Sequence, residues 1–77
     1  MDRDTILRDL VTVETRVSQN QERIGRYREI IESMEGSGDN ADFARIMLQE
    51  CEAVLAVHFS IHEKLLKQLK QLSRSSK

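Results

Sequence analysis

The chain has 77 residues, of which 12 are basic and 13 are acidic, and its formal net charge is −1. This length allows one small domain, whose core is modest unless a metal, a disulfide or a second chain supplements it. Cys51 is the only cysteine, which excludes a disulfide within the chain and suits a reducing compartment. The near-neutral charge gives no general attraction to nucleic acid.

The first ten residues are charged and contain no apolar segment, so we expect no signal peptide. No apolar run in the sequence approaches the roughly 18 residues that a membrane-spanning helix needs. Together these features predict a cytoplasmic protein that does not enter a membrane.

A first helix is predicted over about residues 3–35, beginning at Asp2 or Asp4 as the N-cap. We expect Gly36 to end it as a left-handed C-cap residue. Asn20 is the polar member of its seam, and it either fixes the register by requiring a partner or lies wet at the edge of a bundle. The seam positions, spaced alternately by four and three, are Ile6, Leu10, Val13, Val17, Asn20, Ile24, Tyr27, Ile31 and Met34.

A turn is predicted over residues 36–40, because this segment holds two of the three glycines and the chain has no proline. The second helix is expected over about residues 41–73, capped by Asp39 or Asn40. Its apolar face is wider than one partner helix can cover. Two overlapping seams form this face: Met47, Cys51, Val54, His58, Ile61, Leu65, Gln68 and Leu72; and Leu48, Cys51, Leu55, His58, His62, Leu65, Leu69 and Leu72, with Phe43, Ile46, Phe59 and Leu66 beside them.

Two helices of nearly equal length joined by a short loop predict an all-α fold: an antiparallel, coiled-coil-like helical hairpin spanning residues 1–77. The excess apolar width predicts a second hairpin, most simply in a two-fold homodimer that forms a four-helix bundle. The residues expected in the core or dimer interface are Leu10, Val13, Val17, Asn20, Ile24, Tyr27, Ile31, Leu48, Cys51, Leu55, His58, Leu65 and Leu69.

Cys51, His58 and His62 lie close to one line along the second helix at 100° per residue. His58 and His62 are four residues apart, so their rings could converge on one metal ion. Cys51 is seven residues before His58, roughly 10 Å along the axis, and cannot join them. A metal site would therefore need the two histidines of a second chain, or a carboxylate such as Glu14 or Glu22.

The alternative is that His58 and His62 border the core and hydrogen-bond across the bundle, while Cys51 packs as a small apolar residue. The pattern lacks the glutamate of the HExxH zinc-hydrolase motif, and the glycines lack the context of a phosphate-binding loop. No spacing suggests a Ser/His/Asp triad, and a hairpin offers little concavity for a substrate. We therefore predict no enzymatic activity and no cofactor.

The arginines of the first helix could form a stripe that contacts nucleic acid. Interleaved glutamates favour solvated ion pairs between neighbouring turns instead, and Tyr27 is the only aromatic residue nearby. The arginines are Arg16, Arg23, Arg26 and Arg28, and the glutamates are Glu14, Glu22, Glu29 and Glu32.

The sequence thus predicts an oligomerisation or protein-interaction module. The sequence does not identify the partner protein. The alternatives are a metal-binding bundle that uses His58 and His62 at a subunit interface, and a nucleic-acid accessory protein.

The central segment also resembles a family of short, uncharacterised helical-hairpin proteins common in rhizobia and other alphaproteobacteria. Its approximate pattern is E-x-H-I-x-R-Q-R-E-I-I-x-x-L-E, a turn with glycine, and A-x-x-L-L-x-x-x-E-x-x-x-x-x-H. Arg23 and Tyr27 depart from this pattern, and Cys51 and His62 are not among its positions. The resemblance implies a hairpin and no activity. The matching residues are Glu22, Ile24, Arg26, Arg28, Glu29, Ile30, Ile31, Glu35, Gly38, Ala44, Leu48, Glu52 and His58.

Overall fold

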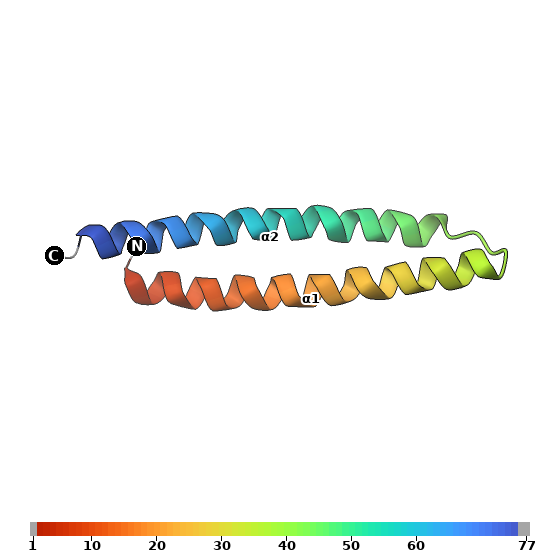
Figure 1. Ribbon diagram of the computed structural model, residues 1–77, viewed down its shortest axis with the longest axis horizontal. Helices are drawn as coiled ribbons and strands as arrows, with labels where there is room; N and C mark the ends of the chain where they lie inside the picture. The colour runs from red at the N-terminus through yellow and green to blue at the C-terminus, as the bar shows by residue number, and fades with distance from the viewer. Residues whose placement is uncertain (1, 76–77) are drawn as a thin grey trace.

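The computed structural model describes residues 2–75. This part of the chain forms two α-helices joined by a turn. Helix α1 (Arg3–Gly36) and helix α2 (Asp42–Ser75) run antiparallel and side by side (Figure 1). The described residues contain no strand. The predicted all-α hairpin is confirmed, as a rod that measures 63 × 14 × 13 Å. The predicted helices covered about residues 3–35 and 41–73.

Helix α1 begins after Asp2, whose extended backbone and side chain form the N-cap. The Asp2 carboxylate accepts a hydrogen bond from the backbone N–H of Thr5 at 2.8 Å. This bond satisfies one of the amides that the first turn leaves unpaired, and it lowers the pKa of Asp2 below its ordinary value. Asp4 lies in the first turn instead, where its charge faces the positive end of the helix dipole.

The turn after α1 shows that the prediction for Gly36 was wrong. Gly36 is the last helical residue, and Gly38 is the residue with a left-handed backbone, at φ 78°. The N–H of Gly38 donates to the carbonyl of Glu35 at 3.1 Å, and the N–H of Asp39 donates to that of Met34 at 2.8 Å. These two bonds define a Schellman motif with glycine at the C′ position.

Helix α2 begins with a hydrogen bond from the N–H of Asp42 to the side-chain oxygen of Asn40, at 2.8 Å. The carbonyl of Ala41 accepts the first helical bond, from the N–H of Arg45 at 3.0 Å. Ala41 is therefore the N-cap residue, and the prediction of Asp39 or Asn40 was wrong, although the Asn40 side chain pairs with the first helical amide. Ala41 and Ala44 are both buried, so small residues bring the start of α2 close to the end of α1.

The core lies between the helices and is deepest near the chain termini. Ile6, Leu10, Val13 and Leu65 form its buried cluster, and Val17, Leu69 and Leu72 pack against it. The other residues expected in the core or dimer interface divide by burial: Asn20 and Ile24 are buried, whereas Tyr27, Ile31, Leu48, Cys51, Leu55 and His58 are half-buried.

Candidate functional site

Asn20 and His58 form the most protected polar contact between the two helices. The Asn20 amide nitrogen lies 2.9 Å from Nδ1 of His58, and Asn20 is only 7% exposed. With the amide nitrogen of Asn20 facing the ring, the amide donates to Nδ1 of His58. Of the two interpretations of Asn20, the structure supports a polar seam residue with a partner rather than a wet edge residue.

Two further polar contacts join the helices on either side of this pair. Nε2 of His62 lies 3.2 Å from a carboxylate oxygen of Glu14. Nearer the turn, Arg28 and Glu52 form a long ion pair at 4.0 Å. These partially exposed contacts contribute little to stability by themselves, but together with Asn20 and His58 they fit one alignment of α1 against α2.

Both histidines therefore have partners on α1 within the same hairpin. Cys51 is half-buried with a free thiol. Among residues 2–75, no three histidine, cysteine, aspartate or glutamate side chains are grouped so that they could hold a metal ion. A metal site that shares His58 and His62 between two chains stays a prediction.

An apolar stripe runs along α2 and is formed by Phe43, Met47, Val54, Val57 and Ile61. At 100° per residue these positions occupy an arc of about 80°, roughly a quarter turn away from the seam that packs on α1. Four of the five are exposed: Phe43 to 76% and Val57 to 58%, with Val54 and Ile61 less so. Exposed Ile46 lies beside the stripe, and Glu50 interrupts it.

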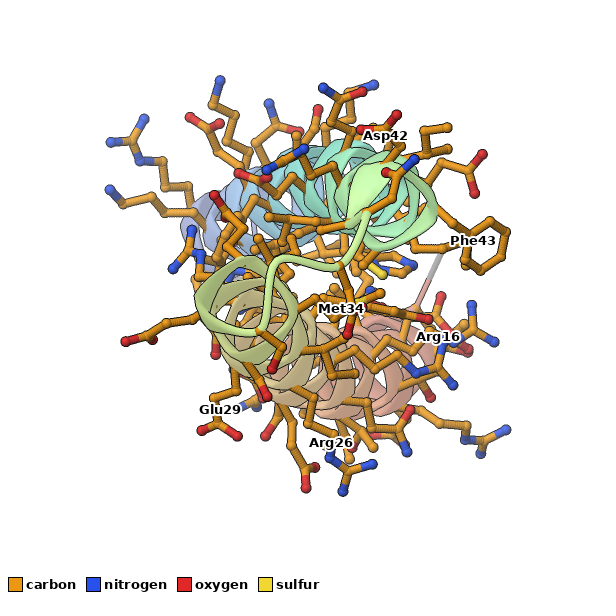
Figure 2. All side chains as sticks on the ribbon, turned by 90° about the vertical axis from the view of Figure 1, so that its right-hand side faces the viewer. Arg16, Arg26, Glu29, Met34, Asp42 and Phe43 are labelled. Atoms are coloured by element: carbon orange, nitrogen blue, oxygen red, sulfur yellow. The ribbon has the colours of Figure 1, made fainter. Side chains whose placement is uncertain are left out.

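The same side of the hairpin has a different character on α1. Figure 2 shows Arg16 of α1 and Phe43 of α2 projecting toward one side of the molecule, while Glu29 projects toward the other. A shallow groove runs between the apolar stripe and α1, so this face is apolar on one helix and basic on the other. The groove is lined by Arg23, Arg26, Tyr27, Ile30, Met47 and Cys51.

The opposite side of the hairpin is less apolar. Phe59 and Leu66 are about half exposed there, and the ion pair between Arg28 and Glu52 crosses this side. A groove that includes Gly25 and Phe59 also opens on it. On α2 these two apolar residues are seven positions apart and do not form a continuous stripe, and on α1 Leu7 and Val11 are also exposed, to 39% and 62%.

Sequence reasoning missed Val57 as a surface residue, although it named the other members of the stripe. The missing signal was a third seam, offset from the two that were used: positions 43, 47, 50, 54, 57 and 61 are also spaced alternately by four and three. Glu50 obscured this seam because it places a charge in the middle of the series.

Within residues 2–75, neither helix combines the length and the hydropathy that a membrane crossing requires. Comparison with protein-family models, with curated proteins and with solved structures finds no match.

Proposed function

We propose that this protein is a non-enzymatic interaction module that works as a homodimer, in which the apolar stripe of one hairpin packs against a second hairpin to form a four-helix bundle. The observation that carries the proposal is the stripe itself. Phe43, Val54, Val57 and Ile61 expose large apolar side chains in one row, which Glu50 interrupts, and such rows are typical of interaction surfaces.

The total surface of the hairpin supports this proposal. A compact monomer of 8.9 kDa would expose roughly 4,800 Å² by the scaling of surface with mass. The hairpin exposes 6016 Å². A compact dimer of twice this mass would bury about 4,000 Å² in total by the same scaling, which is within the range of obligate homodimer interfaces.

The test compares two variants that place the same charge on opposite sides of α2. Val57→Glu puts a carboxylate into the apolar stripe, where pairing would bury it without a partner. Leu66→Glu is the matched control, because Leu66 is also exposed but lies on the other side. Mass is measured by light scattering across a concentration series, and helicity by circular dichroism.

We expect the wild type and Leu66→Glu to be dimers. Val57→Glu should remain helical, but its dimer dissociation constant should be at least tenfold higher than that of the wild type. A monomeric wild type over the whole series would overturn the proposed homodimer. If Leu66→Glu dissociates and Val57→Glu does not, the interaction surface is on the opposite side of the hairpin.

A further inference from the structure

We infer that the two hairpins pair through α2 against α2 in antiparallel orientation, with the two-fold axis close to residue 52. This inference rests on the proposed homodimer and specifies the geometry of its interface.

The first step identifies the helix that covers the stripe. On the same face, α1 offers mainly polar and basic side chains, with Arg16 projecting from it in Figure 2 and Arg23 and Arg26 lining the adjoining groove. If α2 packed over α1 of the second copy, the stripe would lie against these arginines and their charges would lose water. On this face α1 has Ile30 and Tyr27 among the arginines, whereas the stripe of the second copy offers a longer apolar row.

The second step concerns direction, and Glu50 decides it. A parallel two-fold pair of α2 helices places each residue opposite its own copy, so the two Glu50 carboxylates would meet inside the interface. Like charges placed opposite each other across an interface are unfavourable. In an antiparallel pair about residue 52 the two Glu50 residues are displaced by about 6 Å along the axis, which weakens their repulsion relative to a parallel pair, although each carboxylate still loses water against an apolar side chain. Antiparallel pairing also places both α1 helices on the same side of the α2 pair.

The third step sets the register. Successive positions of the seam, including Glu50, are spaced by four, three, four, three and four residues. Reversal of this series about residue 52 superimposes it on itself, as a two-fold interface requires. Phe43 then lies opposite Ile61 of the second copy, and Met47 lies opposite Val57. In the middle of the interface, Glu50 lies opposite Val54.

The test measures distances between spin labels in the full-length chain by pulsed electron paramagnetic resonance. Cys51→Ala removes the native thiol, and one new cysteine is introduced at a time, at Ser73 or at Gln49. Both positions are exposed on α2. Light scattering establishes the mass of each labelled protein, and circular dichroism establishes that each is helical.

For Ser73→Cys, an antiparallel pair about residue 52 predicts a distance of about 60 Å between the two labels, from the rise of 1.5 Å per residue. A parallel pair predicts less than about 30 Å, since packed helices lie 8–10 Å apart. The matched control is Gln49→Cys. Its labels should lie within about 35 Å of each other, because residue 49 is close to the proposed two-fold axis.

A long Ser73 distance with a short Gln49 distance supports the inference. A short Ser73 distance in a dimer overturns the antiparallel orientation and leaves the proposed homodimer intact. A long Gln49 distance overturns the register about residue 52. Monomeric mass in the unlabelled wild type overturns the homodimer itself, so the two proposals fail in distinguishable ways.

Discussion

At the scale of single residues, the contact between Asn20 and His58 gives the hairpin a preferred alignment. Apolar seams with regular spacing tolerate a slide of one helix by a heptad, because each apolar residue then meets another. Asn20 is buried, and a slide would leave its amide without the acceptor on His58. A buried polar group without a partner is costly, so this pair penalises the shifted alignments more than the apolar contacts do.

This role predicts that the effects of substitutions at these two positions on stability are not additive. Asn20→Leu removes the donor and leaves Nδ1 of His58 unpaired, and His58→Leu leaves the amide of Asn20 unpaired. Each single change should lower the free energy of unfolding by about 1–3 kcal/mol. The double variant should recover much of this loss, because both polar groups are gone. Urea denaturation at fixed protein concentration measures all four proteins, and strictly additive effects would contradict the coupling.

The sequence predicted that His58 and His62 hydrogen-bond across the bundle, which is confirmed, but not which residues of α1 they contact. Asn20 and His58 were both recognised as polar positions in apolar seams, yet spacing along one helix carries no information on the alignment of two helices. That alignment depends on the length and geometry of the turn. It is also why the contact of His62 with Glu14 was not predicted, although Glu14 had been considered as a possible partner in a metal site.

At the scale of the elements, the turn shows how local chemistry decides where a helix ends. Gly36 and Gly38 are two residues apart and both lack a Cβ, so composition alone could not distinguish them. The Schellman hydrogen bonds from the N–H groups of Gly38 and Asp39 place the left-handed residue at 38 and keep residue 36 helical. The start of α2 was predicted to within about one residue, because the Asn40 side chain accepts from the first helical amide, although Ala41 holds the N-cap position.

The two glycines therefore make a matched pair of test positions. A Cβ at either would have no neighbour within 4 Å, so packing does not distinguish the two substitutions. Gly38→Ala forces alanine into a left-handed backbone and should cost about 1–2 kcal/mol. Gly36→Ala lies in helical backbone and should be neutral, or stabilising by up to about 1 kcal/mol. Equal thermal stability of the two variants would contradict the assignment of Gly38 as the C′ residue.

At the scale of the whole molecule, the hairpin is too elongated to cover its own apolar surface. Its radius of gyration is 17.6 Å, whereas a compact domain of 77 residues has a value of about 11.5 Å. The cause is that each helix has 34 residues but only one neighbour. Within residues 2–75 no element covers the second apolar side of α2, and the homodimer proposed here would supply one.

A homodimer whose folding depends on association should melt at a temperature that rises with protein concentration. Each tenfold increase in concentration adds about 1.4 kcal/mol to the stability of the dimer. For a folding unit of this combined size, that corresponds to a rise in Tm of roughly 3–5 °C. Circular dichroism melts over a hundredfold range of concentration measure the effect. Val57→Glu should lose most of this dependence and Leu66→Glu should keep it, because only Val57 belongs to the apolar stripe. A Tm that is independent of concentration in the wild type would mean that the single hairpin is stable with its stripe exposed.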